Sequence, residues 1–466
     1  AGNGLTLANG ASVVVERGAH TIDAPLELAG DASLDIRPAT HLTIGAASGN
    51  GTLVAQGDGT LAFTAAPAVG ALSVNVADIT FSNSMNVAPP VTFQRNATLR
   101  TGTGAAVALQ GTISGNANLT KSGSGVLTLN AANTYSGLTR VDAGTLSVPA
   151  LADGGQPSPI GSSGFNEANM LIGPATLRYT GASNVISRGL TLQAGSGRAA
   201  VIRIEEGGDI AFGGRINATS GGFVKTGPGT LRYTGNANNN LHWDNVAADA
   251  RLNIGANGDG PTQGFFGCSI ADGRLVLGAP FQTNTVRSRL VIGINTTTEP
   301  GAETAGELVL TDGVLNMNSQ VLAVGRNNGT TVTAPGGLSS RLTVTGGLIT
   351  NANYISLGYQ NMGLTGYNAR PVMEMSGGYI HVNNLYIAES SGAAADLILR
   401  GGILRPYGTA RFAMAANTSA SFTLDGDALF ETVGAFDTQL GYNNTSIAVA
   451  ILRLNGGTLS TRNIVK

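Results

Sequence analysis

Few residues of this chain could act as ligands of a metal ion. The four histidines lie far apart and lack the His-x-x-x-His spacing of a metal site; they are His20, His41, His242 and His381. Cys268 is the single cysteine, which excludes an intrachain disulfide and a cysteine-rich zinc site. We therefore expect no metal site.

Paired carboxylates could cleave a glycosidic bond if they stood about 5–10 Å apart. On one strand Asp31 and Asp35 would share a face but would lie about 13 Å apart. Glu205 and Glu206 are neighbours in the sequence, so on a strand they would point to opposite faces. Neither pair has the spacing of a glycosidase site.

Charge is densest at one short segment, yet charged residues make up only 12% of the chain. The Gly-x-Gly stretches at 49–51 and 57–59 have no helical pattern after them to hold a phosphate. We expect no catalytic residue and no cofactor, and we expect the charged segment to be a solvated face. Its residues are Arg198, Arg203, Glu205, Glu206 and Asp209.

The composition of the chain excludes further classes of function. The 466 residues include 26 basic and 28 acidic side chains, a net charge of −2, so the chain lacks the charge of a nucleic-acid binder. No run of 18 apolar residues occurs, which predicts no transmembrane segment. Hydrophobic residues are 42% of the chain, enough to bury a core.

Short alternating segments predict strands throughout the chain. Examples are 5–7, 126–129, 201–204 and 397–399, where apolar residues alternate with polar ones. Glycine, at 68 residues, and Asn, Asp and Ser fill the gaps as turn formers. No helical periodicity is sustained, so we expect an all-β fold.

A repeat in the C-terminal half indicates how the strands are arranged. The unit is apolar-x-apolar-x-Gly-Gly-apolar, with variants at the glycines, and successive units are 34, 31, 24, 25 and 30 residues apart. Such a unit cannot bury its apolar side chains alone, so neighbouring units must stack. The units are 308–314, 342–348, 373–379, 397–403, 422–428 and 452–458.

This period fits one coil of a parallel β-helix, a β-solenoid forming a single elongated rod. An antiparallel sandwich array is the alternative, and it requires two-residue hairpin loops such as Asn-Gly or Asp-Gly. The pairs Asn328-Gly329 and Asp259-Gly260 lie inside longer polar gaps, which favours the solenoid. We divide the chain into N-terminal coils (1–115), coils with a loop insertion at 151–169 (116–250) and regular Gly-Gly repeats (251–466).

Residues 117–148 carry a specific motif. Leu-Thr-Lys121-x-Gly-x-Gly is followed by Leu-x-Leu, then Asn133-x-Tyr135-x-Gly-x-Thr, then Gly-x-Leu. This segment resembles the autotransporter-associated β-strand repeat, or passenger-associated transport repeat. A second, weaker copy at 221–236 includes Lys225 and then departs from the pattern.

The resemblance implies a right-handed parallel β-helix outside the cell, in passengers of autotransporters and in large bacterial surface proteins. It implies no catalytic residue. We expect structural roles for Asn133, in an amide ladder along the solenoid, and for Tyr135, packed against a neighbouring coil.

Strand-like sequence reaches both ends of the chain without a capping helix, which suggests end-to-end stacking of copies. The first hypothesis is therefore a secreted, non-enzymatic structural protein that polymerises with itself into a cell-surface filament or layer. Residues 1–15 would contact residues 450–466 of the next copy. The expected contact residues are Leu5, Leu7, Val13, Val15, Leu452, Leu454, Leu459 and Ile464.

Two other hypotheses stay open. The chain could be an autotransporter-type adhesin passenger that binds a cell-surface glycan or protein through the 151–169 insertion, because long loops on solenoids often carry function. A polysaccharide-degrading β-helix enzyme is the third.

The polymer hypothesis makes one direct prediction. Deletion of residues 450–466 should leave soluble monomers, because the exposed strands of one contact surface are lost. Negative-stain electron microscopy of the intact and shortened chains tests this. Filaments of normal length after the deletion would contradict end-to-end stacking.

Overall fold

The fold is taken from a computed structural model. It forms two compact units, Ala1–Thr191 and Leu192–Lys466, and each is described by itself. The structure describes residues 4–195, 198–220, 222–234, 239–241, 267–270, 273–277, 283–286, 289–295, 306–327, 340–360, 370–433, 437–441 and 448–465.

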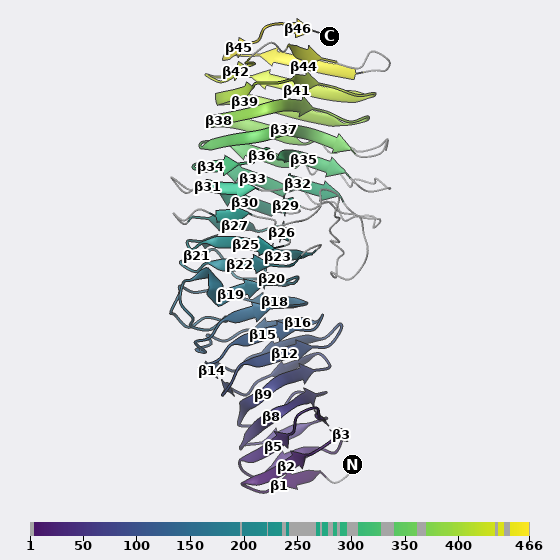
Figure 1. Cartoon of the computed structure of the whole chain (residues 1–466), viewed down its shortest axis with the longest axis vertical. Helices are drawn as coiled ribbons and strands as arrows, with labels where there is room; N and C mark the ends of the chain where they lie inside the picture. Colours follow the sequence, from purple (N-terminus) through teal and green to yellow (C-terminus); the bar gives the residue numbers. More distant parts are fainter. Residues whose placement is uncertain are drawn as a thin grey trace. The chain divides into compact units, whose positions relative to one another are not determined.

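The first unit consists of short strands and one 3-10 turn (Figure 1). These elements are β1 (Leu5–Leu7), β2 (Ala11–Val15), β3 (Ala19–Ile22), β4 (Leu26–Leu28), β5 (Ala32–Ile36), β6 (His41–Ile44), β7 (Ala47–Gly49), β8 (Thr52–Phe63), β9 (Ala71–Phe81), β10 (Met85–Val87), β11 (Val91–Phe93), β12 (Ala97–Thr101), β13 (Ala106–Leu109), β14 (Ile113–Gly115), β15 (Leu119–Ser122), β16 (Val126–Leu129), β17 (Thr139–Val141), β18 (Thr145–Val148), η1 (Glu167–Asn169), β19 (Met170–Ile172), β20 (Thr176–Tyr179) and β21 (Asn184–Ile186).

The division between the units falls within β22 (Leu190–Gln193), and the second unit contains the remaining strands. They are β23 (Ala199–Ile204), β24 (Asp209–Phe212), β25 (Ile216–Ser220), β26 (Gly222–Thr226), β27 (Thr230–Tyr233), β28 (Asn239–Leu241), β29 (Gly267–Ile270), β30 (Gly273–Leu277), β31 (Thr283–Val286), β32 (Arg289–Asn295), β33 (Gly306–Leu310), β34 (Val314–Asn316), β35 (Val321–Asn327), β36 (Arg341–Val344), β37 (Leu348–Gln360), β38 (Val372–Ile387), β39 (Ala394–Pro406), β40 (Ala410–Phe412), β41 (Thr418–Leu424), β42 (Leu429–Glu431), β43 (Thr438–Leu440), β44 (Ala448–Leu454), β45 (Thr458–Ser460) and β46 (Ile464–Val465).

Strands of the first unit pair in parallel with strands one coil further along the chain. Leu5 pairs with Leu26, and Leu26 pairs with Ala47, so each of these coils takes 21 residues. Because the pairing is in register, apolar side chains stack into columns. One buried column consists of Ala32, Leu53, Leu72, Val91 and Ile113.

The Gly-Gly units of the second unit stack as the repeat predicts. Leu342 pairs with Met373 and Met373 with Leu397, and these residues are fully buried. The first apolar positions of all six repeats form one column: Leu308, Leu342, Met373, Leu397, Phe422 and Leu452. The repeat spacing read from the sequence is therefore the length of each coil.

A glycine within each repeat lies where the chain turns a corner of the coil. Gly378 has a φ of +76°, a conformation that side chains rarely adopt. A Cβ atom there would lie only 2.7 Å from the carbonyl oxygen of Gly346 in the preceding coil. Close stacking of the corners thus requires glycine for two independent reasons.

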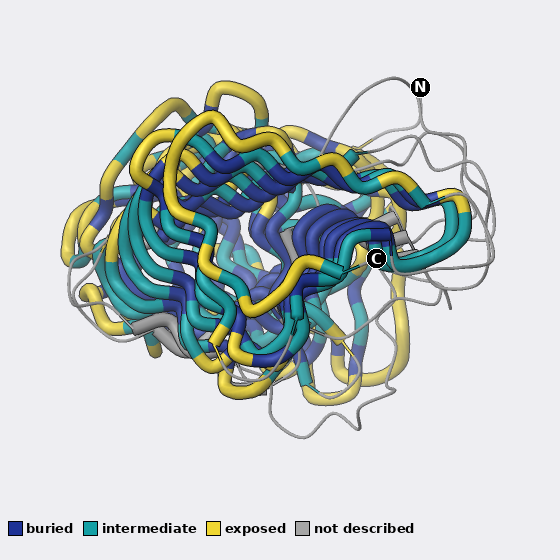
Figure 2. Tube along the Cα trace, turned by 90° about the horizontal axis from the view of Figure 1, so that it is seen from above, coloured by how far each residue is buried: buried dark blue, intermediate teal, exposed yellow. Residues whose placement is uncertain are grey.

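The coils enclose the apolar side chains in both units. Figure 2 shows buried positions gathered on the inside of the turns, whereas exposed positions lie mainly at the bends. The all-β fold is a parallel β-helix, as predicted; the antiparallel alternative does not describe these parallel ladders. The pairs Asn328-Gly329 and Asp259-Gly260 lie outside the described residues. The division of the chain into three stretches stays a prediction.

A search of the described residues finds no helix with the length and apolarity needed to cross a membrane.

The lysine of the repeat motif points into the protein. Lys121 on β15 is fully buried, and its ammonium group donates to the carbonyls of Ser122 (2.8 Å), Gly123 (2.7 Å) and Ala143 (2.9 Å). Burial lowers its pKa to about 8, and the charge of Arg100 adds to this effect. The ammonium group therefore ties three turn carbonyls together across neighbouring coils.

Lys225 on β26, in the weaker copy, is buried in the same way. Its ammonium group donates to the carbonyls of Thr226 (2.9 Å) and Gly227 (2.5 Å). Two of the three lysines in the chain are thus buried and bind the carbonyls of the next two residues, which supports the reading of 221–236 as a second copy of the motif.

The lowered pKa of Lys121 predicts a pH-dependent stability. The unfolded chain holds this proton up to about pH 10.5 and the folded chain only to about pH 8, so the free energy of unfolding should rise by about 2 kcal/mol between pH 8 and 10. Chemical denaturation of the wild type and of Lys121→Met measures the difference. Lys121→Met should lack this rise, and the exposed control Arg17→Met should keep it. Equal pH profiles for the wild type and Lys121→Met would contradict the assignment.

Candidate functional site

The 151–169 insertion departs from the regular coils. Leu119 pairs with Thr139 and Thr139 with Met170, so the coil length grows from 20 to 31 residues at this point. The extra chain leaves the stack between β18 and β19, and it is called the arm below (Figure 1). Leu151 and Ile160 of the arm are buried, and an insertion held on a rigid scaffold in this way often carries function.

Asn133 fastens the arm to the solenoid. Its backbone exchanges two hydrogen bonds with Ser158 (3.0 and 3.1 Å). Its side-chain oxygen accepts from the amide of Ile113 (2.7 Å), and its side-chain nitrogen donates to the carbonyl of Pro159 (2.7 Å). The amide ladder expected at Asn133 is therefore wrong: this side chain joins the preceding coil to the arm.

Tyr135 supports the same junction. It is fully buried, its ring meets Phe93 of a nearby coil edge-on at 6.2 Å, and its hydroxyl lies 2.6 Å from Oγ1 of Thr139. Thr139 in turn donates to the carbonyl of Ile160 in the arm (3.0 Å). Burial raises the pKa of Tyr135 well above its usual range. The predicted packing of Tyr135 against a neighbouring coil is confirmed.

The buried side chain of Arg188 binds four residues of the arm and so holds its parts together. The side chain is only 2% exposed, and its guanidinium group donates to the carbonyls of Ala152 (2.7 Å), Gln156 (3.1 Å) and Gly161 (2.9 Å), and to Oγ of Ser163 (3.1 Å). Burial lowers its pKa. Nothing in the local sequence marked Arg188, because its partners lie 25 to 36 residues away.

The anchored arm presents an apolar side chain to solvent. Phe165 is 70% exposed, and its carbonyl accepts from the amide of Gly189 (2.8 Å). Val185, on the adjoining strand β21, is also 70% exposed. A large exposed aromatic held on a fixed backbone is a feature of binding surfaces, where aromatic residues supply much of the energy.

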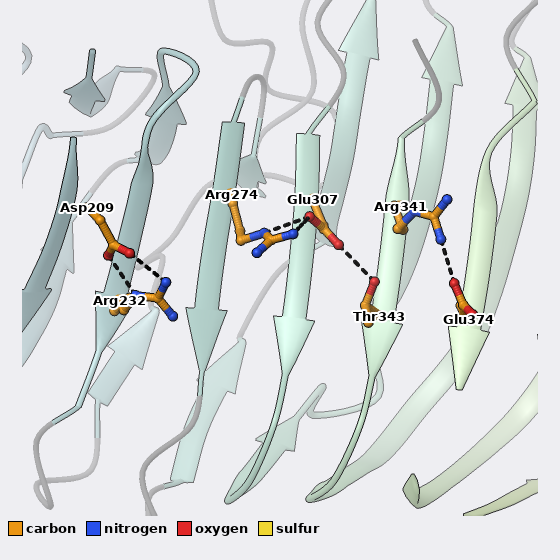
Figure 3. Close-up of polar contacts among 7 residues, drawn as sticks. All are labelled: Asp209, Arg232, Arg274, Glu307, Arg341, Thr343 and Glu374. Atoms are coloured by element: carbon orange, nitrogen blue, oxygen red, sulfur yellow. Dashed lines mark hydrogen bonds and ion pairs between the residues drawn. The ribbon is translucent and has the colours of Figure 1, made fainter. Parts of the chain in front are cut away.

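Charged residues of the second unit lie on one outer face and bind across neighbouring coils (Figure 3). Asp209 accepts two hydrogen bonds from Arg232 (2.6 and 2.5 Å). Arg274 pairs with Glu307 (2.6 Å), and Glu307 also accepts from Thr343 (2.9 Å). These contacts connect β24 to β27, β30 to β33 and β33 to β36.

The ladder continues through carboxylates shared between guanidinium groups. Glu374 binds both Arg341 (2.6 Å) and Arg400 (3.1 Å), and Arg400 also reaches Asp425 (3.2 Å). The planar guanidinium fork suits such shared contacts better than an ammonium group. Arginine is the basic partner in each of these contacts.

The acidic residues weighed as catalytic candidates have structural partners. Asp31 accepts from the amide of Thr52 (2.6 Å), and Asp35 pairs with Arg37 (3.1 Å). In the predicted charged segment, Glu205 pairs with Arg203 (2.8 Å).

The three histidines that the structure describes have separate partners. His20 lies against the carbonyl of Arg17 (2.9 Å), and His41 lies against Oγ1 of Thr43 (3.1 Å). His381 packs between tyrosine rings, and His242 lies outside the described residues. Across the described ranges, no group of three His, Cys, Asp or Glu side chains could hold a metal ion.

The residues predicted for end-to-end assembly lie on β1 and β2 of one unit and on β44, β45 and β46 of the other. Leu7 and Val15 are buried, whereas Leu5, Leu454 and Ile464 are 43%, 57% and 47% exposed. Intermediate exposure is found for the others: Val13, Leu452 and Leu459. Their contact with a second copy stays a prediction.

Comparison with known proteins identifies the repeat. Residues 119–148 match the sequence profile of the passenger-associated-transport-repeat family. Over 145 residues the chain is 41% identical to a protein named Adhesin BmaC autotransporter from Brucella suis biovar 1 (strain 1330). This similarity covers 30% of the chain and 4% of the relative. No solved structure matches the chain.

The chain thus carries a passenger-associated transport repeat, as its motif indicated. In the structure, this repeat comprises the buried Lys121, the first coil corner after it and the Asn133–Tyr135 junction that holds the arm.

Arg188 is expected to control the order of the arm. Arg188→Met should leave the carbonyls of the arm without their donor and lower the free energy of unfolding by about 3 kcal/mol. Hydrogen exchange should accelerate at the 151–169 amides. Arg140→Met, which removes an exposed ion pair on β17, should leave this exchange unchanged. Unaltered protection of the arm in Arg188→Met would disprove the anchoring role.

Proposed function

We propose that this chain is part of an adhesin-type autotransporter passenger, secreted to the bacterial surface, which binds its target through the arm without catalysing a reaction. The observation that carries the proposal is Phe165, which is 70% exposed in an insertion that Arg188 and Asn133 anchor from inside. The repeat family and the printed name of the adhesin relative support the same function and location.

A rigid arm favours binding because ordering of a flexible loop on association costs free energy. The arm is already ordered by hydrogen bonds to Arg188, Asn133 and Thr139. Burial of the Phe165 ring in a partner would contribute about 2 kcal/mol from area alone. The arm therefore has the two properties of a binding hot spot, fixed geometry and an exposed aromatic side chain.

The ion pairs on the outer face of the second unit have a structural role. On the face shown in Figure 3, each carboxylate lies against a guanidinium group of a neighbouring coil. These pairs stabilise the stacked coils, and each of these carboxylates is bound to an arginine. A non-enzymatic role is consistent with this use of the few charged residues.

End-to-end polymerisation is a separate proposal and does not depend on the arm. It requires the exposed side chains of β1 and β44 to be covered by a second copy. The deletion of residues 450–466 tests it independently of adhesion.

Adhesion through the arm can be measured with beads. Beads coated with the chain should attach to cultured epithelial cells, and Phe165→Ser should lower attachment at least about fivefold because the exposed ring is lost. Val433→Ser, at an exposed apolar position of the other unit, should attach as the wild type does. Thermal unfolding should be unchanged in both variants.

Two outcomes would reject the proposal. Wild-type beads that attach no better than albumin-coated beads would show no adhesive activity. Full attachment by Phe165→Ser would show that the arm is not the binding element.

A further inference from the structure

Some described aromatic side chains of the second unit are buried and others are half-buried or exposed. Phe412, Phe422 and Phe430 are buried and pack against one another at 5.0 to 5.3 Å. Tyr379 and Tyr407 instead lie at the surface, and Tyr407 is 38% exposed. Outward aromatic rings in a chain with only 5% aromatic residues need an explanation beyond core packing.

Four neighbouring side chains of β38, β39 and the residue directly after β39 form one row, called the tyrosine row below: Tyr379, His381, Arg405 and Tyr407. A separate pair of half-buried rings, Tyr354 and Tyr386, has its centroids 5.6 Å apart. Tyr379 and His381 share a face of β38, and Arg405 on β39 pairs with His381 in register. Ring centroids lie 6.1 Å apart between Tyr379 and His381 and 4.5 Å apart between His381 and Tyr407. In Figure 1, β37, β38 and β39 are successive layers of the stack, so the row runs across coils.

Side-chain amides lie beside the row. Ala352 and Val382 pair in register and are buried, so the flanking Asn353 and Asn383 point outward. Asn383 donates to the side-chain oxygen of Asn353 (3.3 Å). Asn353 is exposed and Asn383 is half-buried, and the two amides lie on neighbouring coils, about 4.8 Å apart along the stack.

The charges of the row cancel. Arg405 binds Glu431 (2.6 Å) and donates to the hydroxyl of Tyr379 (3.0 Å), with its guanidinium group 5.4 Å from the ring centroid of Tyr379. The guanidinium charge of Arg405 is therefore already paired with a carboxylate. Among the described residues, no hydrogen bond joins the hydroxyl of Tyr407 to another side chain.

We propose that the tyrosine row and its neighbouring amides bind a neutral glycan. Aromatic rings offer an apolar surface to the C–H face of a sugar ring, and paired amides suit its neighbouring hydroxyl groups. The internal Arg405–Glu431 pair favours a neutral hexose or N-acetylhexosamine chain over a uronic-acid chain. This site goes beyond the proposed function, because it lies in a different unit from the arm.

Titration calorimetry with defined oligosaccharides tests the site. Maltohexaose, chitohexaose and a galactose-terminated hexasaccharide sample neutral sugars, and oligogalacturonate samples acidic ones. At least one neutral oligosaccharide should bind the intact chain with a Kd of about 0.1–1 mM. Oligogalacturonate should not bind.

Matched variants separate binding from structure. Tyr407→Ala and His381→Ala should each weaken the neutral sugar at least about tenfold, and Tyr407→Phe should keep the affinity within about threefold because the ring remains. Tyr386→Ala removes a comparable tyrosine from another position of β38 and should leave the affinity unchanged. Thermal unfolding of each variant reports any purely structural effect.

Three results would overturn the proposal: no neutral sugar binding at about 5 mM, preference for oligogalacturonate, or wild-type affinity in both Tyr407→Ala and His381→Ala. The arm variant Phe165→Ser should bind the sugar normally. Loss of cell attachment with retained sugar binding, or the reverse, therefore distinguishes the two proposals.

Discussion

The structure depends on backbone hydrogen bonding between successive coils. Each strand pairs in parallel and in register with the strand one coil away, so like positions of the chain lie about 4.8 Å apart. Leu342, Met373 and Leu397 can form a buried column only because this register holds. The corners stack at the same spacing, which leaves no room for a side chain at Gly378, where a Cβ atom would lie only 2.7 Å from a carbonyl oxygen of the preceding coil.

The same register governs the polar residues. Like charges stacked at this distance would repel, and the outer face instead alternates arginine with carboxylates, as in Arg274–Glu307 and Arg341–Glu374. Guanidinium groups can bridge coils through two donors, so arginine occupies the face. Lys121 has the opposite placement, inside the turn, where three carbonyls surround one compact ammonium group. Charge type and position are thus consequences of coil stacking.

A rigid stack is also a suitable support for binding groups. The arm departs from the coils but remains tied to them by Arg188 and Asn133, and the tyrosine row lies on strands whose own register is fixed. Both arrangements hold side chains in place before a partner arrives, which lowers the entropy lost on binding. The proposed adhesin and glycan sites therefore use the same property of the fold through different elements.

The sequence by itself determined the fold class, the Gly-Gly coil corners and the coil lengths, because alternation, turn glycines and repeat spacing are local features that stacking preserves. It also marked the repeat motif and the packing role of Tyr135. It could not assign Arg188, the true role of Asn133 or the Arg–acid ladder. Their partners lie 20 to 36 residues away, and coil length varies, so only the stacked structure decided which side chains meet.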